Sequence, residues 1–323
     1  MKLNSFKPGR IWLDSCGNPI QAHGGGILYS QGTYYWFGEN KAGPTRPGIL
    51  HDLCRVDFIG INCYSSQDLY NWKYEGIVLP ADQNDPGSDL HPGKVVERPK
   101  VIFNSFTGKY VMWVHMDTAD YETARAGVAV SEQPTGPYRY LGSQRLNGAD
   151  CRDCTIFQDQ DGKAYLVFAS EWNKTIHIVT LDDEYLRPTR TETHVLENRR
   201  REAPALFKSG GHYYLITSGC TGWDPNPAEY ALANSPLGPW KVMGSPCTGS
   251  GVPMTFGSQS TFVFPVIGMR DAFIFMADRW QKEDLGASRY VWLPVRFNGE
   301  QIMIEWLDEW NLEMLCQNHS GIT

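Results

Sequence analysis

The chain lacks long apolar runs and an excess of basic charge. None of its apolar runs reaches the roughly 18 residues that a transmembrane helix needs. The first residues, MKLNSFKPGRIWLDSCG, carry positive charge without the apolar segment of a secretory signal. We therefore predict a cytoplasmic protein, or a secreted one if a leader has been removed. The net charge of −7 provides no basic stripe, so neither nucleic acid nor an anionic membrane surface is an expected partner.

The chain also lacks the pattern of a disulfide framework. Its eight cysteines, at positions 16, 54, 63, 151, 154, 220, 247 and 316, are irregularly spaced, and we expect reduced thiols. Cys151 and Cys154 form a C-x-x-C motif. A zinc site would need a second Cys/His pair at finger or ribbon spacing, and a redox motif would need a βαβ context. Neither is visible, so we interpret both as ordinary strand cysteines and predict no metal and no cofactor.

Long helical periodicity is nearly absent as well. Short runs of β-branched and aromatic residues, bounded by Gly, Pro, Asn and Asp, indicate an all-β protein. With 41% hydrophobic and 13% aromatic residues, the chain can bury a full core. We predict a single domain over residues 1–323.

One pattern occurs five times along the chain: a polar residue, an apolar strand, a turn, and a second strand with an aromatic residue. The polar residue that begins each copy is here called the head residue. The five head residues are His23, Glu97, Asp153, Glu202 and Gln259. The matching aromatic follows each one after 12 to 14 residues, at Tyr35, Tyr110, Tyr165, Tyr214 and Phe273. This spacing is that of a β-hairpin.

A second repeat follows the hairpins. SEQPTGPYRYLG from Ser131 and SPLGPWKVMG from Ser235 share a Ser, Pro, Gly-Pro-aromatic order, and SSQDLYNWKYEG from Ser65 is a looser version. We interpret these segments as outer strands entered through Pro/Gly turns. Five units of about four strands each predict a five-bladed β-propeller. Because inner strands line the central channel of a propeller, the head residues should meet in one pocket.

Such a pocket has the equipment for glycoside hydrolysis. A lone polar residue at a strand end is usually only solvated, but five in register, three of them acidic, favour a site. Carboxylates in a concave, aromatic-rich pocket can donate a proton to a leaving oxygen and handle water. Crowding of acids raises the pKa of one of them, so that it can donate a proton near neutrality. Asp153 and Glu202 are the candidates for such a pair.

Other residues are candidates for binding the sugar. Trp223 either stacks on a sugar face or packs on a neighbouring blade. Glu39 and Tyr121, at the far ends of inner hairpins, reach sugar hydroxyls or cap strands. His23 is expected to be structural or substrate-orienting rather than a base. The candidate substrate-binding residues are Gln21, His23, Glu39, Tyr121, Asn173, Thr221 and Trp223.

Several stretches resemble a known family. They include WLDSCGNPIQAHGGGILYSQGTYYWFGENK, ERPKVIFN, GKYVMWVHMD, CRDCTIFQDQDGKAYLVFAS, REAPALFKSGGHYYLITSGCTGWDPN and GSQSTFVFP, and they run in order along nearly the whole chain. The sequence resembles glycoside hydrolase family 43, and within it the exo-β-1,3-galactanase branch. This resemblance implies a five-bladed propeller and an inverting hydrolase that removes galactose from the non-reducing end of β-1,3-galactan.

The resemblance also implies roles for individual residues. CRDCTIF makes Asp153 the residue that tunes and orients the proton donor, and REAPALF makes Glu202 the general acid. The family's base Asp is expected near Gln21, and none is there. The galactanase branch implies instead that Gln259 of GSQSTF holds the attacking water and that Glu97 of ERPKV engages the sugar or assists. An amide is a very weak base, so it would act by positioning or through a tautomer, and Glu97 as a conventional base is the competing assignment.

Two alternatives concern the whole protein. The same fold and acid would suit an α-L-arabinofuranoside, a β-xyloside or a β-galactofuranoside. A propeller without its base could also be a non-catalytic carbohydrate-binding protein, although Glu202 and Asp153 argue against this. We see no carbohydrate-binding module and expect a catalytic domain that trims short oligosaccharides. Some family members hold a structural ion in the channel, but no dedicated ligand cluster is visible beyond the pocket residues.

Overall fold

The structure is a computed structural model that describes residues 2–49, 53–249 and 252–316. Its strands form five main sheets. The first contains β1 (His23–Ser30), β2 (Thr33–Glu39), β5 (Gly60–Ser66) and β6 (Lys73–Pro80), in that spatial order. The second contains β7 (Lys94–Asn104), β8 (Lys109–Thr118), β9 (Arg125–Ser131) and β10 (Arg139–Gln144).

The other three sheets follow the same antiparallel plan. The third contains β11 (Cys154–Gln158), β12 (Ala164–Ser170), β13 (Thr175–Leu181) and β14 (Pro188–Val195). The fourth contains β15 (Arg201–Ser209), β16 (His212–Gly219), β17 (Glu229–Ala233) and β18 (Lys241–Gly244). The fifth contains β20 (Gln259–Pro265), β21 (Phe273–Arg279), β22 (Arg289–Asn298) and β23 (Gln301–Glu305), with β19 (Cys247–Thr248) added parallel to β23.

The remaining elements are short. The strands β3 (Thr45–Arg46) and β4 (Arg55–Val56) form a two-stranded sheet in the loop between β2 and β5. The helical turns are η1 (Val252–Gly257), η2 (Leu285–Ala287) and α1 (Glu313–Cys316). Within the described ranges, no helix is long and apolar enough to cross a membrane.

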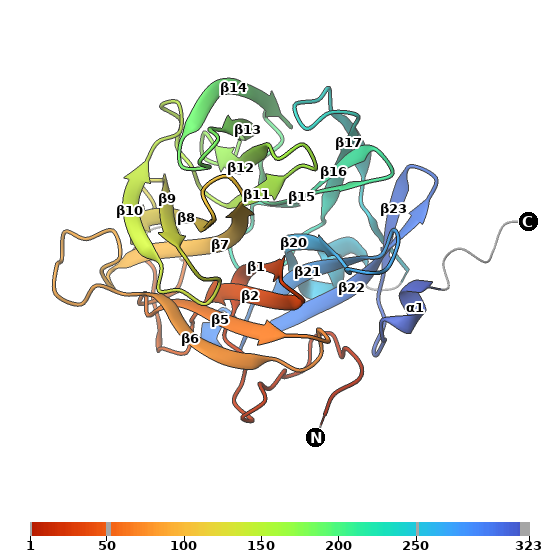
Figure 1. Ribbon diagram of the computed structural model, residues 1–323, viewed down its shortest axis with the longest axis horizontal. Coiled ribbons are helices and arrows are strands. Elements are labelled where there is room, and N and C mark those ends of the chain that lie inside the picture. The colour runs from red at the N-terminus through yellow and green to blue at the C-terminus, as the bar shows by residue number, and fades with distance from the viewer. Residues whose placement is uncertain (1, 50–52, 250–251, 317–323) are drawn as a thin grey trace, which may run out of the picture.

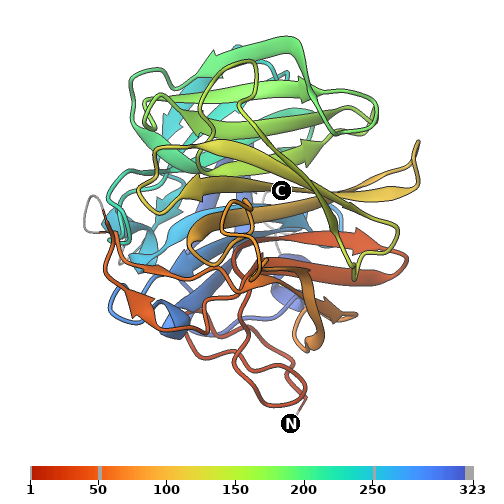
Figure 2. The ribbon, with the colours of Figure 1, turned by 90° about the vertical axis from the view of Figure 1, so that its left-hand side faces the viewer.

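The first strands of the five sheets form a closed ring. β1 packs against β7, β7 against β11, β11 against β15, β15 against β20, and β20 against β1. Figure 1 shows these strands around the centre with the other strands of each sheet outside them. Figure 2 shows the third, second and first sheets following one another down the molecule. The predicted five-bladed β-propeller is confirmed, and the segments from Ser131, Ser235 and Ser65 lead into outer strands as predicted.

A bulge follows the head residue in four of the five inner strands. The pairing register shifts after His23, Glu97 and Glu202 and just after Gln259. In the first, second and fourth blades the next residue has a positive φ, at Gly24 (58°), Arg98 (57°) and Ala203 (51°). A bulge bends a strand and turns a side chain away from the regular alternation. The repeated bulge therefore sets how the head residues are aimed at the channel end.

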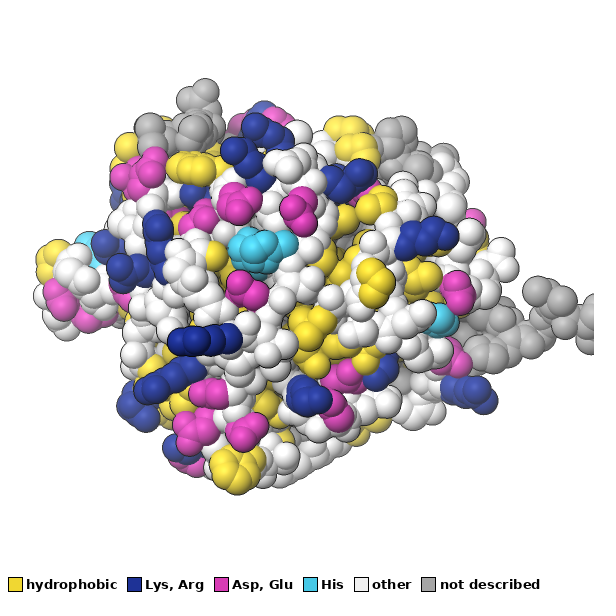
Figure 3. Space-filling view, turned by 90° about the horizontal axis from the view of Figure 1, so that it is seen from above, with side chains coloured by type: hydrophobic (Ala, Val, Ile, Leu, Met, Phe, Trp, Pro, Cys, Tyr) yellow, Lys and Arg dark blue, Asp and Glu magenta, His cyan; other side chains and the backbone are white. Residues whose placement is uncertain are grey.

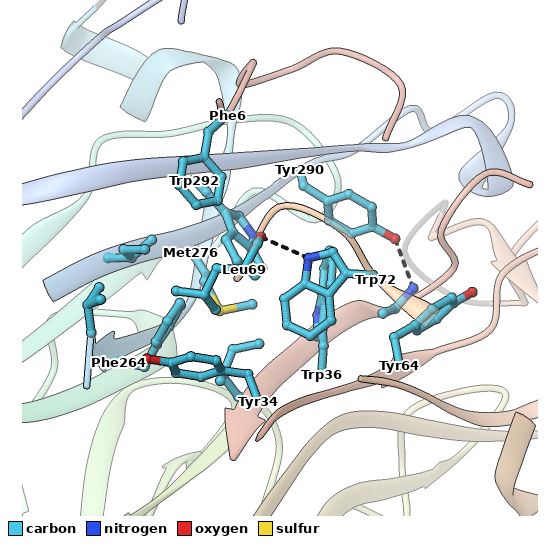
Figure 4. Close-up of a cluster of buried hydrophobic side chains, with 14 of the residues drawn as sticks. Phe6, Tyr34, Trp36, Tyr64, Leu69, Trp72, Phe264, Met276, Tyr290 and Trp292 are labelled. Carbon is cyan, nitrogen blue, oxygen red and sulfur yellow. Dashed lines mark hydrogen bonds between the residues drawn. The ribbon is translucent and has the colours of Figure 1, made fainter. Parts of the chain in front are cut away.

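Five apolar clusters fill the spaces between neighbouring blades. The cluster between the fifth and first blades is rich in tryptophan, and Figure 4 shows Trp36, Trp72 and Trp292 packed together in it. The indole N–H of Trp72 donates a hydrogen bond to the carbonyl of Leu69 at 3.0 Å. Replacing one such buried ring with Ala would cost about 3–5 kcal/mol of unfolding free energy. Phe6 pairs with Trp310 within this cluster, and this pairing joins segments near the two ends of the described chain.

The distribution of charge on the surface and the state of the described cysteines agree with the composition of the sequence. Figure 3 shows acidic and basic side chains interspersed over one face. All seven cysteines whose side chains are described are free, and the side chain of Cys316 is not described. Cys151 and Cys154 are buried in the apolar cluster between the second and third blades. They serve as ordinary core residues there.

Candidate active site

Two connected pockets lie at the end of the channel where the inner strands begin. The inner pocket has a volume of about 480 Å³, and the outer pocket has a volume of about 1270 Å³. Seven residues line both pockets: Leu53, Glu97, Tyr121, Asp153, Glu202, Gly222 and Trp223. The inner pocket adds Glu39, Arg98, Gln259 and Trp280, and the outer pocket adds His115, Arg152, Trp172, Asn173, Cys220, Thr221, Asp224 and Lys282. Four of the five head residues therefore meet at one site.

Glu202, on β15, stands at the boundary between the two pockets. Its Oε2 accepts a hydrogen bond from the Asn173 amide at 2.8 Å, and its Oε1 accepts one from the Gln259 amide at 2.9 Å. Burial, followed by the nearby carboxylate of Asp153, raises the pKa of Glu202 to about 8. The carboxyl group is therefore mostly protonated at neutral pH. A protonated acid facing a pocket can donate its proton to a leaving group.

Gln259 has hydrogen bonds at every position of its amide. Its Oε1 accepts from Arg98 Nη2 at 2.7 Å and from Trp280 Nε1 at 2.9 Å. The Arg98 guanidinium and the Trp280 indole can only donate hydrogen bonds, so the amide atom that they contact must be the oxygen. The Nε2 group donates to Glu202 and, at 3.1 Å, to Ser218. The amide is thus held rigidly beside the candidate proton donor.

Arg98 links the second, third and fifth blades. Its Nη2 also donates to Asp153 at 2.8 Å, and its Nη1 donates to the carbonyl of Ser260 at 3.3 Å. Its backbone N–H donates to Glu39 Oε1 at 3.0 Å. The positive φ of Arg98 lets one residue offer its backbone to the first blade and its side chain to the others. This single guanidinium fixes both Asp153 and Gln259.

Glu97 is held in its ionised form. Lys41 Nζ lies 3.7 Å from its Oε1, His115 Nδ1 lies 3.6 Å from its Oε2, and the Tyr121 hydroxyl donates to it at 3.3 Å. Burial raises the pKa of Glu97, but His115 and Lys41 outweigh burial and lower it to about 2. A carboxylate with so low a pKa is a weak proton acceptor.

Lys41 is buried and connects two carboxylates with two aromatic rings. Its Nζ lies 2.7 Å from Glu39 Oε2 and is 5.3 Å from the ring centroid of Trp223 and 5.8 Å from that of Trp280. Burial lowers the pKa of Lys41, but the carboxylates of Glu39 and Glu97 outweigh burial and raise it. Lys41 therefore stays charged and holds this side of the inner pocket together.

Trp223 lies at the pockets and also packs against a neighbouring blade, and its stacking on a sugar stays a prediction. It lines both pockets, and its indole N–H donates to the carbonyl of Cys54, in the loop of the first blade, at 2.8 Å. Its ring meets that of Trp280 nearly at right angles, with 4.8 Å between centroids. Thr221 lines the outer pocket and donates to the carbonyl of Asp224 at 2.6 Å. The loop of the fourth blade is thus docked on the first blade beside the pocket.

Gln21 and His23 lie away from the lining of the described pockets. His23 is fully buried; its Nδ1 lies 3.1 Å from Asp278 Oδ1, and its ring stacks on Tyr290. The side chain of Gln21 donates to the carbonyl of Gly286 at 2.9 Å. The first-blade position therefore joins blades one and five instead of facing the pocket.

The residues of the site that were missed in the sequence include Lys41, Arg98 and Trp280. Arg98 directly follows a head residue, and Trp280 ends the fifth copy of the repeat. Alternation along a regular strand directs neighbours of a head residue away from the pocket, whereas the bulge brings Arg98 into it. Lys41, two residues after the end of β2, carried no pattern signal.

One cluster among the described residues has the composition of a metal site. Glu97, His115 and Asp153 place their ligand atoms within 4.8 Å of one another. Burial lowers the pKa of His115, but Asp117, whose Oδ2 is 3.0 Å from Nε2, and Glu97 outweigh burial and raise it to about 10. A protonated imidazole offers no lone pair to a metal. Asp153 is already paired with the guanidinium of Arg98, so the cluster does not fit a cation.

Comparison with known proteins identifies relatives over most of the chain. Residues 18–250 match the model of the glycosyl hydrolases family 43. The β-1,3-galactosidase BT3683 of that family, solved with galactodeoxynojirimycin, is 42% identical, with a TM-score of 0.87 over 95% of this chain and 100% of that one. An exo-β-1,3-galactanase from Phanerochaete chrysosporium, solved with galactose, is 39% identical, with a TM-score of 0.86 over 96% of this chain and 68% of that one. A variant of that enzyme was solved with β-1,3-galactotriose.

Other relatives are longer than this chain. The chain covers 65% of the β-1,3-galactosidase BT0265, which is 40% identical with a TM-score of 0.90 over 98% of this chain. A curated relative, a β-D-galactofuranosidase from Aspergillus niger, is 26% identical over 189 residues, which are 55% of this chain and 54% of that protein.

Proposed function

The chain belongs to the glycosyl hydrolases family 43, and on this premise we propose that it is an exo-acting, inverting galactan 1,3-β-galactosidase. It would release galactose from the non-reducing end of β-1,3-galactan or its oligosaccharides. Support for this substrate comes from the relatives solved with galactose and with β-1,3-galactotriose. The fold and the site residues supply the chemistry.

The observation that carries the proposal is the environment of Glu202. This residue is buried, it receives hydrogen bonds from Asn173 and Gln259, and burial and Asp153 raise its pKa to about 8. We assign Glu202 as the general acid that protonates the glycosidic oxygen. Asp153, fixed by Arg98, keeps negative charge beside Glu202 and so keeps the proton on it.

Gln259 is our candidate for positioning the attacking water. An inverting enzyme needs a group opposite the acid that places water on the anomeric carbon. Glu97 is a poor base because its pKa is lowered to about 2. The amide of Gln259 is oriented by Arg98 and Trp280, and its Nε2 group donates to Glu202 at 2.9 Å, so it would hold the water by exchanging that hydrogen bond when a substrate separates the two side chains. Its contribution would be orientation rather than strong basicity.

Azide rescue separates the two assignments. Gln259→Ala and Glu97→Ala are matched truncations that open space for a small anion. Azide is expected to restore galactose transfer, as galactosyl azide, to the Gln259 variant. If only the Glu97 variant is rescued, then Glu97 is the base and the assignment of Gln259 is wrong.

The activity itself is tested by galactose release from β-1,3-galactobiose and β-1,3-galactan. The wild type should release galactose, and Glu202→Gln should slow the release about 10³-fold, within the range for loss of an acid catalyst. Equally slow release by both proteins would show a carbohydrate-binding protein instead. The raised pKa of Glu202 speaks against that reading, because binding alone does not require a protonated carboxyl group.

A second candidate substrate is a β-galactofuranoside, which the Aspergillus niger relative favours. That relative is 26% identical, whereas the galactan-directed relatives reach 42%. A panel of aryl β-galactopyranoside, β-galactofuranoside, α-L-arabinofuranoside and β-xyloside decides between these sugars. We expect the highest kcat/KM on the galactopyranoside.

A further inference from the structure

One aromatic side chain of the outer pocket takes no part in the proposed proton transfer or in the positioning of water. Trp172 lines this pocket and keeps 48% of its surface exposed. It lies in the tight turn between β12 and β13, where Glu171, Trp172 and Asn173 all have positive φ, at 55°, 56° and 61°. Three consecutive non-glycine residues in this region are costly and persist only where surrounding contacts hold them.

The carboxylate of Asp150 supplies those contacts. Its Oδ1 accepts from the Ser170 hydroxyl and from the Glu171 backbone N–H, each at 2.8 Å. Its Oδ2 accepts from the Trp172 backbone N–H at 3.4 Å. The turn is therefore built as a rigid support on the third blade.

The indole ring is also held in place. The guanidinium carbon of Arg152 lies 4.0 Å from the ring centroid of Trp172. Arg152 is itself buried, and its Nη1 donates to the backbone carbonyl of Tyr121 at 2.9 Å. A guanidinium stacked on tryptophan is a favourable cation–π contact, and here it fixes the plane of the ring.

The position of the Trp172 ring relative to Glu202 indicates which part of the substrate the ring contacts. Asn173, the next residue, donates to Glu202 Oε2, so the turn also orients the proton donor. The glycosidic oxygen must lie at Glu202, which lines both pockets. Gln259 lines the inner pocket, so the galactose that water attacks belongs there. The sugar on the other side of the oxygen then belongs in the outer pocket, along the wall made by Trp172.

We propose that Trp172 is the platform for the first sugar of the leaving group and that it sets the preference for a saccharide leaving group over a small one. The inference rests on the proposed galactosidase function. The apolar C–H face of a pyranose suits an aromatic ring, and such contacts add affinity beyond simple burial. The substrate class is accordingly a β-galactoside whose leaving group is itself a sugar.

The test compares two substrates that share the galactose and differ in the leaving group. β-1,3-Galactobiose places a sugar in the outer pocket, whereas β-galactosyl fluoride places only a fluoride ion there. The measured quantity is the ratio of kcat/KM for galactobiose to kcat/KM for the fluoride. Trp172→Ala should lower this ratio about 10-fold, the equivalent of one stacking contact. Trp172→Phe keeps an aromatic face and should stay within about threefold of the wild-type ratio.

Phe106→Ala is the matched control. Phe106 is 79% exposed in the turn between β7 and β8 and is absent from the lining of both described pockets. Its removal should leave the ratio at the wild-type value. An unchanged ratio in an active Trp172→Ala protein, which includes an equal loss of kcat/KM on both substrates, would overturn the role of Trp172 but not the galactosidase function. A wild type that cleaves neither substrate would instead overturn the galactosidase function, and this inference with it.

Discussion

His23 on β1 and Glu202 on β15 occupy corresponding places in their blades. Each is followed by a residue with positive φ and by a shift in strand pairing. His23 is sealed by Tyr290 and Asp278 and has no exposed surface, whereas Glu202 faces two pockets. The same backbone device therefore serves a structural joint in one blade and the candidate proton donor in another. The head residue is structural where neighbouring side chains cover it, as at His23, and is available for chemistry where it faces a pocket, as at Glu202.

Glu202→Gln gives the largest expected difference between the two positions. The amide keeps the size of the side chain but cannot act as a proton donor, so kcat on β-1,3-galactobiose should fall about 10³-fold.

The same substitution should also change the stability of the protein, because it replaces a buried carboxyl group whose pKa is raised to about 8. The folded state favours the protonated form of this group, so its stabilising effect is lost as the pH rises from about 4.5 to about 8. The variant should therefore unfold at a higher temperature than the wild type at pH 8; a drop in both activity and melting temperature would point to a structural role instead.

Asp153→Asn tests how the pKa of Glu202 is set. Since the acid must be protonated, kcat/KM of the wild type should decline as the pH rises through about 8. The carboxylate of Asp153 contributes to raising that pKa, and Arg98 opposes it. Removing the charge of Asp153 should move the alkaline decline of kcat/KM about one unit to lower pH. A pH profile that loses height without moving would show that Asp153 does not tune Glu202.

Lys41→Met tests the charged framework on the first-blade side of the pocket. Lys41 contacts Glu39 and Glu97 and is one of the groups that lower the pKa of Glu97 to about 2. Because Glu97 is expected to engage the sugar as a carboxylate, the loss of Lys41 should raise that pKa, move the acid limb of kcat/KM to higher pH, and raise KM about 10-fold through the disturbed carboxylates. Lys41→Arg keeps the charge and should restore the acid limb. If the acid limb of kcat/KM does not move in the Met variant, then Lys41 has only a packing role.

His23→Ala should have the smallest effect on catalysis. The imidazole is fully buried against Asp278, so its removal leaves a buried carboxylate with fewer partners and should cost about 1–3 kcal/mol of unfolding free energy. Because His23 lies away from the described pocket lining, kcat on galactobiose should change less than about threefold. Urea denaturation and steady-state kinetics measure the two effects. A loss of kcat comparable to that of Glu202→Gln would place His23 in the reaction.

Much of this comparison could be predicted from the sequence. The spacing from each head residue to its aromatic partner predicted the hairpins, and the recurrence predicted the propeller and the meeting of Glu97, Asp153, Glu202 and Gln259. The burial of His23 could not be predicted, because it depends on Tyr290 and Asp278, more than 250 residues away along the chain. The single domain over 1–323 and the cytoplasmic location stay predictions.

The contribution of Arg98 and Lys41 was equally hidden. Local patterning indicates which side of a strand faces the core, but a bulge reverses that alternation at one residue. Arg98 enters the pocket through such a bulge, with a φ of 57° that sequence does not announce in an arginine. Its partners Asp153 and Gln259 come from other blades, and only the closed ring brings them together. Long-range closure, rather than local propensity, assembled the site.

The most direct test of the central claim follows the anomeric signals of galactose by proton NMR during the first minutes of β-1,3-galactobiose hydrolysis. With Glu202 as acid and water positioned from the opposite face, the first galactose released from the non-reducing end must be the α-anomer, which then mutarotates. Glu202→Gln should release galactose about 10³-fold more slowly. Release of the β-anomer first, or no galactose from the wild type, would contradict the account.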